Sequence, residues 1–144
     1  MSVRESVASN IVTTLQAATT PVTPAYVTRE PFEFNELSNA QFPAILVQTA
    51  GEARRDVTVG DSAITREGII TYELVGYVKS TTIDTARNNL VETIEEALDT
   101  DRTRNGNALD TQIISIETDQ GSIAPIGGVI VTVEVMYNFV RGNT

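Results

Sequence analysis

The sequence predicts an α+β fold, a mostly antiparallel sheet of about four or five strands with two helices packed on one face. Residues 2–18 and 82–99 carry apolar side chains at helical spacing. Residues 70–79 and 129–139 largely alternate between apolar and polar, as half-buried strands do. The order helix, strand, strand, helix, strand, strand allows antiparallel pairing of neighbours around one core. The 144 residues suffice for one domain, which we expect to span 1–144.

The first helix is predicted to begin after Ser2, because Ser2 and Glu5 have the spacing of a capping box. One face of this helix is apolar, through Val3, Val7, Ile11, Leu15 and Ala18. Pro21 and Pro24 end the helix, since proline cannot continue its hydrogen-bond ladder. An irregular segment then runs to Pro43. Three of its residues are expected to hold it against the core, namely Pro31, Phe32 and Phe34.

A first strand is predicted over residues 44–49, directly after Pro43. The polar residues 51–60 that follow, which include Arg54, Arg55 and Asp56, are expected to form a loop. Residues 57–64 fit either a partner strand or a continuation of that loop. The second strand is predicted over residues 70–79.

The second helix is predicted over residues 82–99, about 27 Å long. Thr81 and Asp84 have a capping-box spacing, with Asp in place of the usual Glu. The apolar stripe consists of Ile83, Ala86, Leu90, Ile94, Ala97 and Leu98. The outer face is acidic, through Glu92, Glu95, Glu96 and Asp99.

The remaining chain is predicted to turn at Asn105-Gly106 and to form strands over residues 111–117 and 129–139. The last strand is nearly strict in its alternation. Its apolar face consists of Val129, Val131, Val133, Val135, Tyr137 and Phe139. We expect this strand to be the structural centre of the domain.

The sequence contains no cysteine and no histidine, and Lys79 is its only lysine. Disulfides, thiolate metal sites, thiol catalysis and Ser-His-Asp arrangements are therefore excluded. We predict that the protein is not an enzyme and has neither cofactor nor metal. The formal net charge of −9 disfavours binding to nucleic-acid phosphates. No apolar run reaches the roughly 18 residues of a membrane span, so we expect no membrane partner and synthesis in the cytosol.

Three local patterns have a functional and a structural interpretation. Residues 101–112 match several positions of a calcium loop, but Gln112 stands where a bidentate Glu is needed, so a plain turn is favoured. Glu92 and Glu96 share a helix face and would suit an acid/base pair. Because this face lies opposite the apolar stripe, a solvated or partner-facing surface is favoured. Arg54-Arg55 suits an anion clamp, an exposed loop or docking onto an acidic neighbour.

The order of these features resembles one known family. The pattern comprises the N-terminal amphipathic helix, strand residues 42–47, a charged loop with Glu52, residues 69–78, the helix 89–98 running into Asp101, and the closing strand 129–137. Together they resemble the tail terminator (tail completion, neck) proteins of long-tailed bacteriophages. The resemblance covers residues 2–139. The chain departs from the family at 104–107, which read Arg-Asn-Gly-Asn where members have a Leu-Gly-Gly-like turn.

The resemblance implies a structural virion protein. By this resemblance such a subunit forms a hexameric ring that caps the head-proximal end of the tail tube. The ring ends tube polymerisation and joins the tail to the neck or connector. The implied partners are further copies of the chain, the tail tube protein and the neck (stopper) protein, while DNA passes through without specific binding. The implied location is the tail–neck junction of a virion assembled in the host cytoplasm.

A ring gives two groups of residues a hypothetical role. Head-to-tail contacts need two different patches on each subunit. We expect the arm 51–66 to reach a neighbour through Arg54, Arg55, Asp56 and Arg66. We expect the second helix to face the lumen or a partner through Glu92, Glu95, Glu96 and Asp99. Only charges within about 8 Å of the lumen would repel passing DNA at physiological salt.

Two other functions remain open on the sequence alone. A neck stopper or head-completion protein would bind the portal side and gate DNA, and a subunit of a phage-derived injection system belongs to the same group. The other alternative is a small carboxylate-using hydrolase or a ligand-binding domain. The lack of His, Cys and clustered acids disfavours this last group.

Overall fold

The computed structural model describes residues 2–56, 65–119 and 125–140. These ranges contain two α-helices, α1 (Val3–Gln16) and α2 (Ile83–Thr100). They also contain five strands, namely β1 (Tyr26–Thr28), β2 (Ala44–Asp56), β3 (Thr65–Lys79), β4 (Asp110–Thr118) and β5 (Ile126–Val140). Two short 3-10 helices, Phe34–Glu36 and Asn39–Gln41, lie between β1 and β2.

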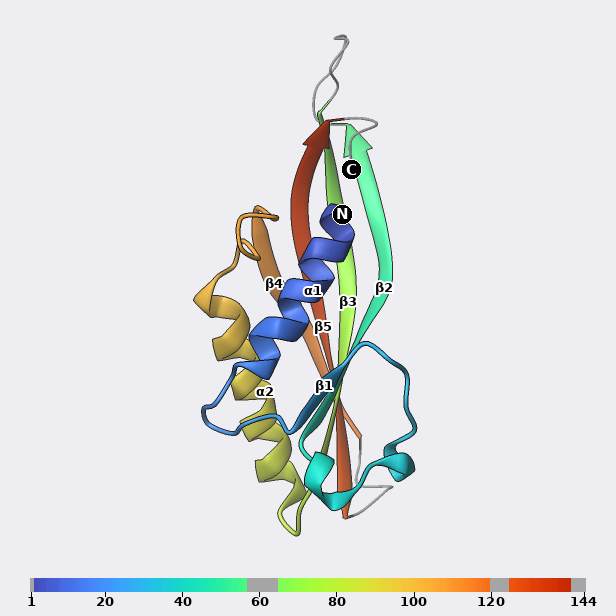
Figure 1. Ribbon diagram of the computed structural model, residues 1–144, viewed down its shortest axis with the longest axis vertical. Coiled ribbons are helices and arrows are strands. Elements are labelled where there is room, and N and C mark those ends of the chain that lie inside the picture. The colour runs from blue at the N-terminus through green and yellow to red at the C-terminus, as the bar shows by residue number, and fades with distance from the viewer. Residues whose placement is uncertain (1, 57–64, 120–124, 141–144) are drawn as a thin grey trace.

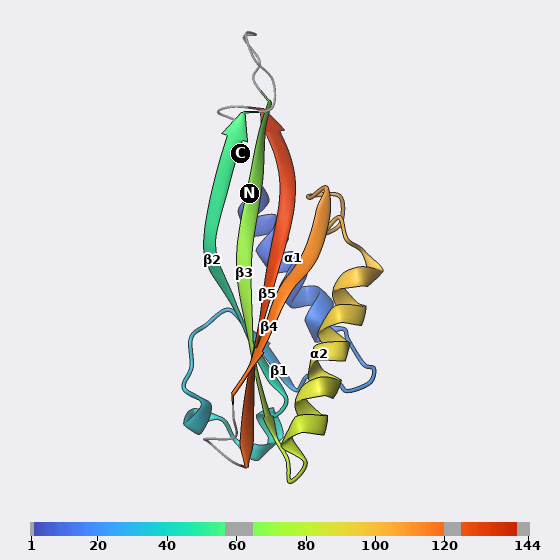
Figure 2. The ribbon, with the colours of Figure 1, turned by 180° about the vertical axis from the view of Figure 1, so that it is seen from behind.

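The five strands form one sheet in the order β1-β2-β3-β5-β4. β1 pairs with β2 in parallel, and the other three pairs are antiparallel. Both helices lie on the same face of the sheet, in front of it in Figure 1 and behind it in Figure 2. The far ends of β2, β3 and β5 project beyond the helices (Figure 1). The predicted α+β fold with two helices on one face is confirmed.

The core lies between the sheet and the two helices. The alternation predicted for β5 is confirmed, because every second residue from Val129 to Tyr137 is at most 2% exposed. β3 contributes Ile70, Tyr72, Leu74 and Val78 to the same core. The helices contribute Val7, Ile11, Leu15, Leu90, Ile94 and Leu98. Full burial of such side chains stabilises a fold by about 1.5–3 kcal/mol each. The side chain of Phe139 lies outside the described part of the chain.

The two helices begin differently. In α1 the Ser2 hydroxyl accepts the Glu5 N–H at 3.2 Å, so the predicted cap is confirmed. In α2 the predicted capping box of Thr81 and Asp84 is wrong. The N-cap is Thr82, whose side chain makes no capping bond, and Asp84 instead pairs with Arg87 one turn later at 3.4 Å.

The prediction for residues 51–60 is wrong over its first part, because β2 continues to Asp56. Residues 52–56 pair with residues 66–70 of β3, after an irregularity between Thr49 and Gly51. This end of the hairpin projects past the helices (Figure 1). It therefore covers no core, and its sequence lacks the alternation that identifies a half-buried strand. Residues 57–64, predicted as strand or loop, lie outside the described residues.

The irregular segment before β2 is anchored by aromatic packing. The Phe32 ring lies 5.7 Å from Tyr26 and 5.9 Å from Tyr77, measured between ring centroids. Phe32 therefore anchors the segment to Tyr77 of β3, outside the core cluster against which the sequence placed it, while the side chain of Phe34 is not described. Strand β1 within this segment was not predicted, since three residues are too few for a periodic pattern.

Candidate functional site

Glu52 is the centre of a polar cluster on the projecting end of the sheet. Its carboxylate accepts hydrogen bonds from the Arg54 Nε, at 2.6 Å, and from the Tyr137 hydroxyl. Arg4 of α1 forms a 2.9 Å ion pair with the same carboxylate. The Glu52 side chain is only 8% exposed. The cluster therefore ties α1, β2 and β5 together at the edge of the apolar core, to which Tyr137 also belongs.

Tyr137 fits into this cluster because β3 has a glycine beside it. A Cβ placed on Gly68 would lie 2.5 Å from the Tyr137 ring, closer than real Cβ atoms approach any neighbour. Burial, followed by the bond to the Glu52 carboxylate, raises the pKa of the Tyr137 hydroxyl. The hydroxyl thus stays protonated at neutral pH and remains a donor. Arg54 also donates to it, at 3.3 Å.

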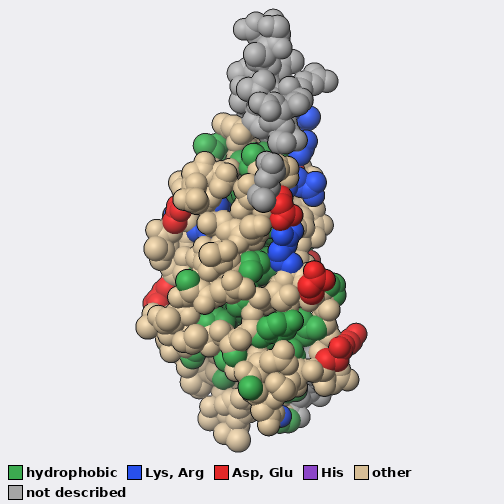
Figure 3. Space-filling view, in the orientation of Figure 1, with side chains coloured by type: hydrophobic (Ala, Val, Ile, Leu, Met, Phe, Trp, Pro, Cys, Tyr) green, Lys and Arg blue, Asp and Glu red, His purple; other side chains and the backbone are tan. Residues whose placement is uncertain are grey.

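The four residues predicted to form the basic arm have different surroundings. Arg54 belongs to the Glu52 cluster, whereas the Arg55 side chain is 73% exposed and donates to Glu67 at 3.1 Å. Arg66 is half-buried, and the side chain of Asp56 is not described. Figure 3 shows basic and acidic side chains gathered along the margin of the molecule over β2. Arg55 is therefore the member of the arm best placed to contact another molecule.

The four acidic residues predicted on α2 do not share one surface. Glu95 and Asp99 face β4 and line a groove of about 430 Å³ together with Ile113 and Ile116. Glu96 lies on the side of α2 that faces the end of α1. None of these three forms a salt bridge within the described residues, and the same holds for Glu92. The helix thus presents unpaired negative charge in two directions.

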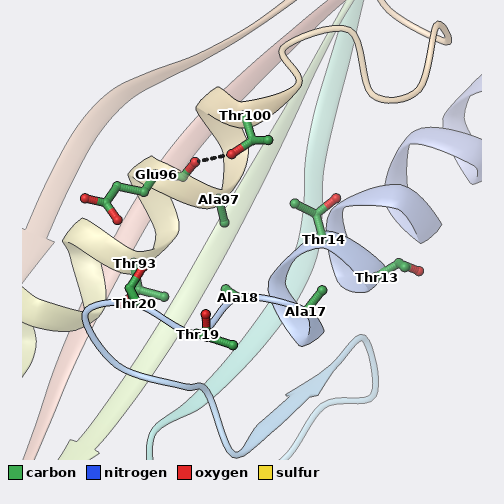
Figure 4. A pocket seen from close by; sticks show the side chains of 10 residues that line it. All are labelled: Thr13, Thr14, Ala17, Ala18, Thr19, Thr20, Thr93, Glu96, Ala97 and Thr100. Carbon is green, nitrogen blue, oxygen red and sulfur yellow. Dashed lines mark hydrogen bonds between the residues drawn. The ribbon is translucent and has the colours of Figure 1, made fainter.

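A second groove, of about 510 Å³, lies between the end of α1 and α2 (Figure 4). Its lining is almost entirely threonine and alanine. Figure 4 shows the Glu96 carboxylate pointing away from α1, and only its backbone carbonyl is engaged, by Thr100 at 2.9 Å. The groove therefore has no converging charged groups. The acid/base interpretation of Glu92 and Glu96 gains no support from this geometry.

The loop after α2 is the plain turn that the sequence favours. The Asp101 carboxylate accepts the backbone N–H groups of Thr103 and Asn105, at 3.0 and 2.8 Å. The Thr103 hydroxyl also donates to this carboxylate, at 2.6 Å, and this side-chain hydrogen bond is the main cause of the lowered pKa of Asp101. Residues 104–106 all have positive φ, including Asn105 and Gly106 of the predicted turn. Among the described residues no group of three or more acids is placed to hold a metal ion.

Sequence reasoning missed the buried arginines. Arg104 is 0% exposed and donates to the carbonyls of Leu98 and Asp101, which closes the end of α2. Arg87 is 8% exposed and pairs with Asp119 at 2.5 Å, which fastens α2 to the end of β4. For Arg87 a signal existed, since it lies within the apolar stripe of α2. For Arg87 and Arg104 alike, the positive charge of the side chain is typical of an exposed position.

Within the described ranges, neither helix has the length and apolar character needed to cross a bilayer. This finding agrees with the apolar runs of the sequence, which are short.

Comparison with known proteins gives a likeness of fold. No family model matches the sequence, and no curated protein does. One solved structure that matches is a chain of the "Virion of native gene transfer agent (GTA) particle". The TM-score is 0.60 at 9% sequence identity, with 96% of this chain and 98% of that chain covered. The protein thus shares the fold of a virion chain over nearly its whole length.

Proposed function

We propose that the protein is a structural subunit of a phage-like virion and that it acts as a tail terminator. In this role copies of the single domain 1–144 form a ring, hexameric in the family that the sequence resembles, at the head-proximal end of the tail tube. The ring ends tube polymerisation and joins the tail to the neck. The tube and neck proteins are then its partners, and DNA passes through without specific binding.

The observation that carries this proposal is the fold likeness to a chain of a gene transfer agent virion. It covers 96% of this chain and 98% of the other, so the likeness concerns whole subunits and not a shared fragment. The sequence pattern supports the same role independently, because it resembles tail terminators from helix α1 to strand β5. Because the sequence identity is only 9%, the proposed role as a tail terminator rests on the fold likeness and the sequence pattern together.

The chemistry of the described surface also favours a structural role. Catalytic sites bring titratable groups together in a cleft, where burial and neighbouring charges shift their pKa values. Here the acidic residues of α2 lie on different sides of the helix, and the buried Glu52 carboxylate is paired with the more exposed Arg4 and Arg54. This arrangement offers surfaces for contact and no converged reactive groups.

Within this proposal the predicted site residues have different roles. Arg55 reaches a neighbouring subunit, while Arg54 holds the projecting hairpin in shape through Glu52. The acidic residues of α2 face the lumen or a neighbour. Those that face the lumen repel DNA phosphates over about one Debye length.

The test is a comparison of partners. The purified protein is mixed in separate samples with assembled tail tubes and with the portal complex of the same virion, and each sample is sedimented. The proposal predicts co-sedimentation with the tubes, at a few copies per tube because only an end is bound. Binding to the portal complex alone would instead identify a neck stopper. Binding to neither would contradict a role at the tail–neck junction.

A further inference from the structure

Strand β4 is an open edge of the sheet with an apolar surface. It pairs with β5 and, within the described residues, has no strand on its other side. Three large hydrophobic side chains are exposed among the described residues. They are Leu109, directly before β4, and Ile114 and Ile116 within it, at 54%, 49% and 44% exposure. Natural edge strands are commonly guarded by lysine or proline, and β4 contains neither. An edge of this kind is suited to pairing with another strand.

The opposite side of the sheet has a second open edge. β1 pairs only with residues 44–46 of β2. From Val47 to Asp56, β2 therefore has no strand beside it on that side, within the described residues. The open stretch of β2, residues 47–56, and the nine residues of β4 are similar in length. Each subunit thus carries two different open edges, as a head-to-tail contact requires.

We infer that β4 of one subunit pairs antiparallel with the open stretch of β2 in the next subunit, an inference that rests on the proposed ring. The direction of the strands follows from the topology. β2 is antiparallel to β3, β3 to β5 and β5 to β4, so β4 runs opposite to β2. Subunits related by rotation about an axis along the strands keep this relation. Antiparallel pairing between copies therefore needs no reorientation.

The open edges of β4 and β2 also lie at the same position along the strand direction. Ser115 pairs with Thr132, Thr132 with Glu73, and Glu73 with Gln48, so Ser115 and Gln48 lie in one row across the sheet. Both face away from the helices, and both are exposed. Each edge strand has an irregularity within one row of this level, at Ile114 in β4 and at Ala50 in β2. The edges thus bend at about the same height, which favours pairing along their length.

Charge adds to this complementarity. Glu95 and Asp99 form no salt bridge with the described residues and lie beside β4 in the groove that Ile116 also lines, together with Arg102, whose charge is paired with Asp110. Arg55, with a 73% exposed side chain, lies near the end of the open stretch of β2. Joining the two edges brings opposite charges toward each other around the apolar contact. Two copies of either edge alone would bring like charges together, so head-to-tail contact is favoured.

Cysteine cross-linking tests this pairing, because the chain contains no cysteine. A Gln48→Cys/Ser115→Cys double variant is mixed with tail tubes and treated with a short bismaleimide. Side chains opposite each other on paired strands lie about 4.5–5.5 Å apart at Cβ, within reach of the reagent. We expect a ladder of covalent oligomers that ends at the size of the ring. Each single variant, and a Gln48→Cys/Thr85→Cys control with an exposed site on α2, should remain monomeric.

The possible results separate this inference from the proposed function. A ring on tube ends without a ladder would overturn the strand pairing and leave the proposed function standing. A dimer from Ser115→Cys alone would also overturn it, because that product requires two β4 edges to meet. Failure of the wild-type protein to form any ring on tubes would contradict the proposed function, and the inference with it.

A second variant measures the apolar contact without cross-linking. Ile116→Lys places a charge on the side of β4 that borders the groove with Glu95 and Asp99, at a side chain that is 44% exposed, and should leave the monomer fold intact, as judged by circular dichroism. We expect the amount of ring on tubes to fall by about tenfold, the effect of a guarded edge. The matched control Thr85→Lys should change it little. An unchanged ring yield for Ile116→Lys would contradict a role of β4 in the contact.

Discussion

At the scale of single residues, the fold depends on polar groups that are buried in pairs. Glu52 is the clearest example, since its carboxylate is surrounded by donors from α1, β2 and β5. A buried carboxylate without such donors would cost several kcal/mol, so the cluster is stable only as a whole. Arg54 is exposed, as expected for the arm, but sequence reasoning did not find its hydrogen bond to Tyr137, because the two residues are distant in sequence.

The Tyr137 hydroxyl is the group in this cluster that can be removed most cleanly. Tyr137→Phe keeps the ring over Gly68 and deletes one hydrogen bond to Glu52. We expect the free energy of unfolding to fall by about 1 kcal/mol, measured by urea denaturation. Tyr26→Phe is the control, because the described residues offer its hydroxyl no hydrogen bond. Equal stability of Tyr137→Phe and wild type would mean that the cluster does not hold the hairpin.

Arg104 gives a second prediction at this scale. Arg104→Ala removes the donor to the Leu98 and Asp101 carbonyls from a fully buried position. The loss should be about 1–3 kcal/mol of unfolding free energy, from thermal or urea denaturation. Arg102→Ala, two residues earlier, removes only an exposed ion pair with Asp110 and should cost much less. Similar losses for the two variants would contradict the capping role of Arg104.

At the scale of elements, sequence patterns predict those parts that cover a core. β5, β3 and both helices were found because each presents a regular apolar face to the same interior. The outer half of β2 was predicted as a loop, since strand pairing there depends on β3 and not on burial. The candidate surfaces were identified only as groups of charge. Their separation into an Arg54 bound to Tyr137, an Arg55 that is largely exposed and acidic residues on different sides of α2 depends on contacts between distant residues.

The buried face of β5 should tolerate no charge. Val133 is 0% exposed in the centre of the sheet, so Val133→Asp would bury an unpaired carboxylate. The cost of several kcal/mol is comparable to the whole stability of a small domain, and the variant should be unfolded by circular dichroism. Thr132→Asp, the next residue on the opposite face, should remain folded. A folded Val133→Asp protein would contradict the position of β5 in the core.

At the scale of the whole molecule, the domain has two different edges and an asymmetric distribution of charge. The projecting hairpin carries Arg55, while α2 carries, beside β4 at the other side of the sheet, carboxylates that form no salt bridge within the described residues. This asymmetry suits a subunit that contacts copies of itself head to tail. The sequence alone does not show this asymmetry, because residues 55 and 95 are far apart along the chain and their places on the sheet are known only from the fold.

Charge reversal of Arg55 tests this asymmetry. The Arg55 side chain is 73% exposed, and its salt bridge with Glu67 is the one it forms within the described residues, so Arg55→Glu should change the thermal midpoint little. Assembly on tail tubes, measured by co-sedimentation, should weaken. Lys79→Glu, at the other end of β3, is the matched control and should assemble normally. Normal assembly of Arg55→Glu would remove Arg55 from the contact.

The central claim is that copies of this chain close into a ring that ends a tail tube. Electron microscopy of tubes that polymerise in the presence of the protein tests it most directly. The account predicts a ring at one end of each tube, and tubes whose length stops increasing once that end is capped. Bare tube ends, with the same length distribution with and without the protein, would contradict it.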